Sequence, residues 1–125
     1  MAITYASDVK DDRMTAVVTQ IDAGAGAGKL EIGTAAMGTV LATITLADPS
    51  ATVSGGVLTL SSTPRSDTSA DASGTAAAAR IRDSDNNDVI TGLTVGTGSE
   101  DIVLDSVSIT AGQTVTINSG TITHA

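Results

Sequence analysis

The segment Asp83-Ser-Asp-Asn-Asn-Asp88 holds the densest group of oxygen ligands in the chain. Alternating carboxylates in a tight turn are suited to binding Ca²⁺. An EF-hand loop needs Gly at its sixth position and Glu at its twelfth, where this sequence has Asp88 and Thr94. Asp and Asn also tolerate left-handed backbone angles, which favours an Asx-rich hairpin turn. We therefore predict a turn here and keep cation binding as the alternative.

Other residue types suited to catalysis are sparse. His124 is the only histidine, and because the base of a Ser-His-Asp triad must be held rigidly, we predict an exposed or subunit-contact residue. Glu100, Asp101 and Asp105 could pair as glycosidase carboxylates. The chain has no Phe or Trp and one Tyr to stack on a sugar, so we predict a charged loop and a strand edge instead. We expect no enzyme activity, no metal and no cofactor.

Two arginines are the best candidates for recognising a partner. Arg80 and Arg82 alternate with Ala79 and Ile81, which places both on the outer face of a strand. They either pair with Asp or Glu across the sheet or contact an acidic partner surface. The N-terminal segment adds three further candidates. The predicted interface residues are Tyr5, Val9, Arg13, Arg80 and Arg82.

The elements that must position these groups follow from a Thr-rich alternation of apolar and polar residues. This alternation is clearest from residue 107 to residue 125. Short runs of this kind with turn signals between them predict a mainly β fold, an antiparallel β-sandwich of jelly-roll type. The predicted strands are 29–33, 39–46, 57–60, 76–82, 89–95, 101–105, 107–110, 113–118 and 121–124. Residues 61–75 are predicted to form a long loop with a short extended piece.

Residues 7–22 form the one predicted helix, preceded by an extended arm. Ser7 or Asp8 is expected to cap its N-terminus. Its predicted apolar stripe comprises Val9, Met14, Val17, Val18 and Ile21.

Alternating Ala and Gly at residues 23–28 predict a flexible linker. A dinucleotide fingerprint needs the opposite order, a strand before it and a helix after it. The expected organisation is thus residues 1–28 as arm, helix and Gly/Ala linker, and residues 29–125 as a β-sandwich domain.

Composition restricts the partners. Fourteen acidic against six basic residues give a net charge of −8, which opposes nucleic-acid binding. No apolar run approaches the roughly 20 residues of a membrane span, and no signal-peptide pattern is present, so we expect a chain made and used in a cytoplasm. Large aliphatic residues are about a fifth of the chain, near the lower limit for a folded domain. We therefore expect neighbouring subunits, in a trimer or dimer, to supply part of the burial.

Several segments together resemble small virion structural proteins of tailed bacteriophages. They are residues 41–46, 67–76, 79–83, 101–105 and 108–117, so the resemblance spans roughly residue 29 to the C-terminus. It implies a β-sandwich that decorates or cements the capsid surface by binding major capsid subunits, after synthesis in the bacterial host cytoplasm. A tail- or fibre-associated protein (baseplate, tail tube or fibre adaptor) is the alternative. The sequence departs from the pattern before residues 79–83, where such proteins often carry an aromatic residue and this chain has Ala.

Two other classes of function stay open on the residues alone. A carbohydrate-binding or adhesin-like sandwich is disfavoured because the chain offers so few aromatic side chains. An enzyme is disfavoured because reactive groups are scarce.

Overall fold

The computed structural model describes residues 5–24, 26–47, 50–61 and 65–123. They form the helix α1 (Ser7–Ile21), a short 3-10 turn (Ala35–Met37) and twelve strands. The first six strands are β1 (Lys29–Gly33), β2 (Val40–Thr45), β3 (Ala51–Ser54), β4 (Val57–Leu60), β5 (Arg65–Asp67) and β6 (Gly74–Thr75). The others are β7 (Ala78–Arg82), β8 (Asp88–Leu93), β9 (Val95–Gly96), β10 (Ile102–Leu104), β11 (Ser108–Ile109) and β12 (Val115–Thr123).

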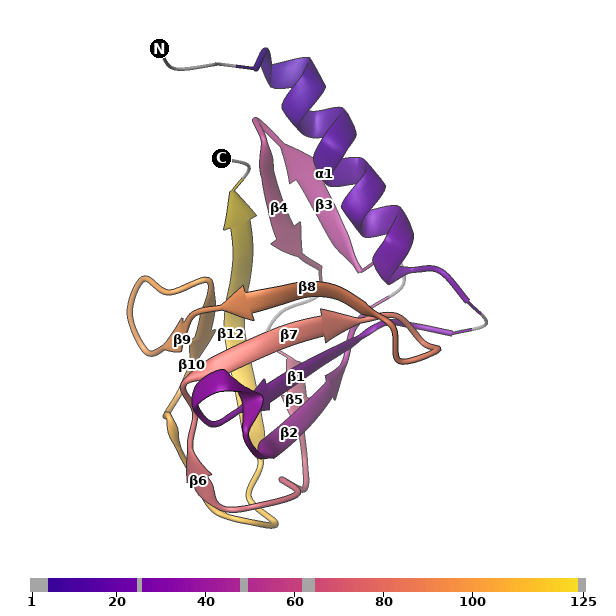
Figure 1. The fold of residues 1–125 in the computed structure, drawn as a ribbon. Coiled ribbons are helices and arrows are strands. Elements are labelled where there is room, and N and C mark those ends of the chain that lie inside the picture. The colour runs from indigo at the N-terminus through magenta and orange to yellow at the C-terminus, as the bar shows by residue number, and fades with distance from the viewer. Residues whose placement is uncertain (1–4, 25, 48–49, 62–64, 124–125) are drawn as a thin grey trace.

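Two main sheets carry the fold. The four-stranded sheet has the order β2-β1-β7-β8 and is antiparallel throughout. The six-stranded sheet has the order β3-β4-β12-β10-β9, and β5 also pairs with β12. The four-stranded sheet crosses in front of β12 in Figure 1. The arrangement is mainly β with an N-terminal helix and is consistent with the predicted sandwich, although β9 and β10 pair in parallel. The jelly-roll topology stays a prediction.

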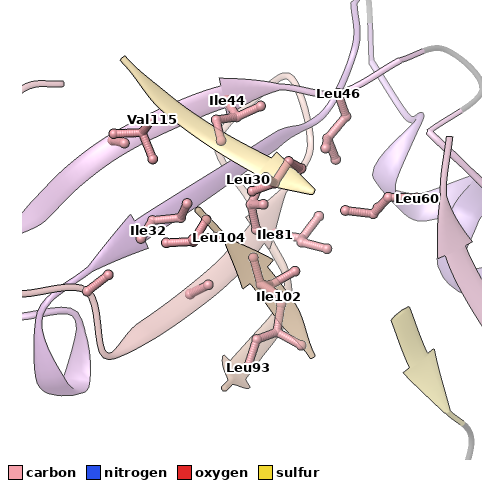
Figure 2. Packing of buried hydrophobic residues seen from close by; sticks show 14 of the residues in the cluster. Leu30, Ile32, Ile44, Leu46, Leu60, Ile81, Leu93, Ile102, Leu104 and Val115 are labelled. Atoms are coloured by element: carbon pink, nitrogen blue, oxygen red, sulfur yellow. The ribbon is translucent and has the colours of Figure 1, made fainter. Parts of the chain in front are cut away.

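Aliphatic side chains from both sheets meet in one core. Period-2 alternation points Leu30 and Ile81 inward from the four-stranded sheet, where they meet Ile102 and Leu104 of the other sheet (Figure 2). The accessible surface of the chain is 6228 Å², close to the roughly 6,100 Å² typical of a folded monomer of this mass. Burial contributed by a neighbouring subunit, in a trimer or dimer, stays a prediction.

The helix α1 packs on β3 and β4 through a narrower stripe than predicted (Figure 1). Met14 and Ile21 are buried, and Val17 and Val18 pack partly against the core. Val9 is 41% exposed, so its assignment to the buried stripe is wrong. Met14 lies five positions after Val9, and at 3.6 residues per turn this spacing places them on different faces of the helix.

The helix begins without the predicted side-chain cap. Ala6 occupies the N-cap position, and no side chain hydrogen bonds there. The Lys10 amide donates to the Ala6 carbonyl at 3.1 Å, which closes the first turn. The prediction that Ser7 or Asp8 caps the helix is therefore wrong, because Ser7 is already helical.

Two aspartates fasten α1 to the β3–β4 hairpin. The Gly56 amide in the hairpin turn donates to Asp11 Oδ1 at 2.6 Å. The Ser50 amide, just before β3, donates to Asp22 Oδ1 at 3.1 Å. The two contacts hold both ends of the hairpin to one side of the helix, so α1 is a fixed part of the β structure.

The strand β12 corrects the prediction of two strands at 113–118 and 121–124. One continuous strand runs from Val115 to Thr123 and pairs in turn with β5, β10 and β4. Gly120, which we expected in a turn, is buried within it. A Cβ atom there would lie 2.5 Å from Leu60 Cδ1 and 3.2 Å from Ile102 Cδ1. Glycine is needed at this position because Leu60 and Ile102 pack closely against the backbone, next to an irregularity in the β10–β12 register.

The outer edge of β2 is covered by groups from the 65–71 segment. Asp67 Oδ2 accepts the Thr43 amide at 3.0 Å, and Arg65 Nε donates to the Thr45 carbonyl at 2.8 Å. The Asp71 amide donates to the Leu41 carbonyl at 2.8 Å. Because β5 also pairs with β12, these bonds join the two sheets and leave the edge of β2 protected from strand addition.

The Gly/Ala linker is packed at both ends. Ser84 Oγ donates to the Ala23 carbonyl at 3.2 Å. Gly28 is buried, and a Cβ atom there would lie 2.6 Å from Ile21 Cγ2 and 2.9 Å from the Arg82 carbonyl oxygen. Glycine at residue 28 thus serves close packing between α1 and β7.

Candidate functional site

The Asp83–Asp88 segment is the predicted Asx turn. Asp83 Oδ1 accepts the amides of Asp85 and Asn87 at 3.0 and 2.9 Å, and Oδ2 accepts Asn87 Nδ2 at 3.2 Å. Asn86 has a φ of 65°, the left-handed angle that asparagine tolerates. Hydrogen bonds from Asn87 lower the pKa of Asp83 below its ordinary value. The predicted turn is confirmed, and the Asp83 carboxylate accepts hydrogen bonds from amide groups of the turn itself.

Metal-ligating groups do not form a cation site in the described parts of the chain, the Asp83–Asp88 turn included. Within residues 5–24, 26–47, 50–61 and 65–123, no three His, Cys, Asp or Glu residues lie together as a cation site. Cation binding at the Asp83–Asp88 turn therefore gains no support from the geometry.

Arg80 and Arg82 pair with carboxylates on the outer face of the four-stranded sheet. Arg80 Nε lies 2.5 Å from Glu31 Oε1, directly across from it in the β1–β7 register. Arg82 Nε lies 2.7 Å from Asp88 Oδ1 on β8, and Arg82 Nη1 lies 3.8 Å from Glu31 Oε1. The hydrogen bond with Asp88 raises the pKa of Arg82, and the same bond lowers the pKa of Asp88. Cross-strand pairing is confirmed, whereas contact with an acidic partner stays a prediction.

The predicted interface residues of the N-terminal segment lie along one side of α1. The guanidinium carbon of Arg13 lies 4.2 Å from the ring centroid of Tyr5, a cation–π contact. Val9 precedes Arg13 by four residues, which places the two on one helix face, and Tyr5, just before the helix, reaches this face through its contact with Arg13. The structure thus brings together Tyr5, Val9 and Arg13 but keeps Arg80 and Arg82 in a different cluster.

The other catalytic candidates form separate local contacts. Glu100 Oε1 accepts the Gly98 amide at 3.0 Å, and Asp101 Oδ2 accepts the Thr94 amide at 3.1 Å. Asp105 Oδ1 accepts Asn118 Nδ2 at 2.7 Å. Each carboxylate thus stabilises its own loop or strand end. His124 lies outside the described residues.

Sequence reasoning missed a hydroxyl-rich surface on the six-stranded sheet, here called the threonine face. The register places Thr52, Thr59 and Thr121 in one row across β3, β4 and β12. Ser54, Val57 and Thr123 form the next row. Val57 is half-buried and the other five are exposed. The threonine face comprises Thr52, Ser54, Val57, Thr59, Thr121 and Thr123. Alternation in β4 and β12 signals part of it, but β3 was not predicted.

The remaining observations concern the molecule as a whole. No pocket opens among the residues that the structure describes. The single long helix of that part of the chain is too short and too polar to cross a membrane. No model of a protein family, no curated protein and no solved structure matches the chain. The surfaces described above therefore carry the proposals that follow.

Proposed function

We propose that this protein is a structural subunit of a tailed-bacteriophage virion that decorates or cements the capsid by binding major capsid subunits. The virion assignment comes from the resemblance of residues 29–125 to such proteins. The binding role is supported by one observation, the exposed side of α1. There Val9 is 41% exposed and Arg13 stacks on Tyr5.

The exposed side of α1 has the properties of a recognition surface. Tyrosine and arginine are enriched among the residues that carry most of the binding energy in protein interfaces. Asp11 and Asp22 fasten the helix to the hairpin, so its exposed side is held in place before a partner arrives. Such preorganisation lowers the entropic cost of association. A bound subunit then stabilises the assembled shell by mass action.

Point substitutions test this role better than removal of residues 1–22. Met14 and Ile21 belong to the core, so deletion would change folding together with attachment. We expect Val9→Glu and Arg13→Glu to require about tenfold more protein for half-occupancy of capsids that lack it. Gln20→Glu, an exposed change on the same helix, is the matched control with the same charge change as Val9→Glu. Cosedimentation of purified protein with the particles measures the occupancy.

The outcomes separate the head from the tail. Binding to isolated heads that falls in Val9→Glu and Arg13→Glu but not in Gln20→Glu supports decoration. Binding to isolated tails alone supports the tail- or fibre-associated alternative. Equal binding by all three variants overturns the role of α1, and no binding to either particle fraction overturns the virion proposal.

A further inference from the structure

The Arg13 guanidinium differs from the other arginines of the chain in having no oxygen acceptor. The other three each donate to an oxygen of the chain, Arg65 to a carbonyl and Arg80 and Arg82 to carboxylates. Arg13 stacks on the Tyr5 ring and forms no hydrogen bond or ion pair with the residues that the structure describes. Its donors are therefore available to a partner.

The spacing of charges along α1 explains why Arg13 has no carboxylate. Side chains three or four positions apart on a helix are neighbours. At those distances from Arg13 the helix carries no acidic side chain, only Val9, Lys10, Ala16 and Val17. Asp12 is the adjacent residue, and one position turns a helix by about 100°, so its carboxylate projects in another direction. The helix itself supplies no acidic group to Arg13, and a partner can supply one.

Stacking prepares the guanidinium for such a group. The guanidinium carbon lies 4.2 Å from the centroid of the Tyr5 ring, so the ring covers one face of the planar group. The N–H donors lie in that plane and match the two oxygens of a carboxylate. Because the exposed Arg13 side chain is already held against the ring, less rotamer freedom is lost when it binds.

We infer that Arg13 pairs with a carboxylate of the partner, while an apolar side chain of the partner covers Val9. Val9 lies one turn before Arg13 and, at 41% exposed, is the one large hydrophobic residue exposed in the described parts of the chain. Apolar contact there excludes water from the neighbouring ion pair, which strengthens charged hydrogen bonds. This inference rests on the proposed function, since it assigns the chemistry of the partner at the same surface.

Zero-length crosslinking locates the carboxylate. Arg13→Lys keeps the positive charge and places a primary amine at this position, which a carbodiimide joins to a carboxylate in contact with it. The variant is bound to capsids that lack the protein, and mass spectrometry maps the crosslinked peptides. We expect residue 13 to be joined to an Asp or Glu of the major capsid subunit. Thr15→Lys is the matched control, because residue 15 is exposed but lies about 200° around the helix from residue 13.

Affinity measurements test whether the two groups interact. Arg13→Gln removes the charge, and we expect it to raise the concentration for half-occupancy about tenfold. Changing the crosslinked acidic residue of the capsid to its amide should weaken the wild type about tenfold and Arg13→Gln far less, because the pair is lost only once. Added salt should weaken the wild type more than Arg13→Gln, because it screens the ion pair.

The outcomes separate this inference from the proposed function. A crosslink at residue 13 but not at residue 15, together with coupled losses of affinity, supports the inference. Wild-type protein that binds capsids, with no crosslink at residue 13 or with equal crosslinking at both positions, overturns the inference alone. Equal salt dependence of the wild type and Arg13→Gln also overturns it, and that result needs no lysine variant. Wild-type protein that binds no particle overturns the proposed function and this inference with it.

Discussion

The Asp67 carboxylate accepts a hydrogen bond of 3.0 Å from the backbone amide of Thr43, which joins β5 to the edge of β2. The same side chain accepts the Ser69 amide through its other oxygen at 3.0 Å. One acidic residue thus fixes its own loop and satisfies a strand edge of the opposite sheet. The 65–71 segment, expected from the sequence to be mostly loop, is therefore a structural link.

We expect Asp67→Ala to lower the free energy of unfolding by about 1.5–3 kcal/mol, because two amides lose a charged acceptor. Asp67→Asn keeps a carbonyl oxygen and should lose less. Urea denaturation followed by circular dichroism measures both variants. Equal stability of Asp67→Ala and the wild type would show that water replaces the carboxylate at no cost.

The packing of α1 predicts contrasting effects for two of its apolar residues. Met14→Ala should cost about 2–5 kcal/mol, because it leaves a cavity between the helix and the hairpin. Val9→Ala should stay within about 0.5 kcal/mol of the wild type, because Val9 lies on the exposed side. Thermal and urea unfolding of both variants measure the contrast. Similar losses would contradict the assignment of helix faces.

Gly120 predicts a steric effect within β12. Gly120→Ala should cost about 1–3 kcal/mol, because its Cβ atom would overlap with Leu60. Gly26→Ala is the control, since a Cβ atom there meets Ser84 Cβ at an ordinary 3.9 Å. Gly26→Ala should cause no loss of stability. A Gly120→Ala variant as stable as this control would contradict the packing of β12 against Leu60.

The acidic groups of the Asp83–Asp88 turn predict a pH dependence of stability. The folded pKa values of Asp83 and Asp88 both lie below the ordinary value of 3.8. Their contribution is therefore complete above pH 3.8 and is lost as the pH falls through the lower, folded values. Asp88→Asn should be less stable than the wild type at pH 6, and the gap should narrow as the pH falls below 3.8, because the wild-type carboxylate is then progressively protonated. Asp12→Asn, an exposed change on α1, is the control. Urea midpoints at pH 6 and at a series of pH values below 3.8 provide the measurement, and a gap that does not narrow over that series would show that the charge of Asp88 is not its cause.

Local patterns predicted the central strands well and the irregular ones poorly. The bounds of β1 match the predicted 29–33, because Leu30 and Ile32 alternate with charged residues between two glycines. β3 was missed because its residues are small or polar apart from Val53, so its pairing with β4 decides its structure. The Ser119-Gly120 pair reads as a turn locally. Only its contacts with Leu60 on β4 and Ile102 on β10 show that it continues a strand.

The same limit applies to the functional surfaces. The alternation of residues predicted that Arg80 and Arg82 point outward from their strand. It did not predict their carboxylate partners, which lie on β1 and β8, because the order of strands in the sheet determines that pairing. The threonine face joins residues separated by more than 60 positions in the sequence. No local pattern shows that Thr59 and Thr121 are neighbours, since that depends on the register between β4 and β12.

The central place of β12 has a consequence for how the chain folds during synthesis. All three of its partners, β4, β5 and β10, precede it in the sequence. When β4, β5 and β10 leave the ribosome, each has one edge that stays unpaired until β12 has been synthesised. Contacts of such long sequence separation form slowly, and exposed strand edges invite pairing with other chains in the meantime. We expect the nascent protein to be most prone to aggregation in the interval before residues 115–123 emerge.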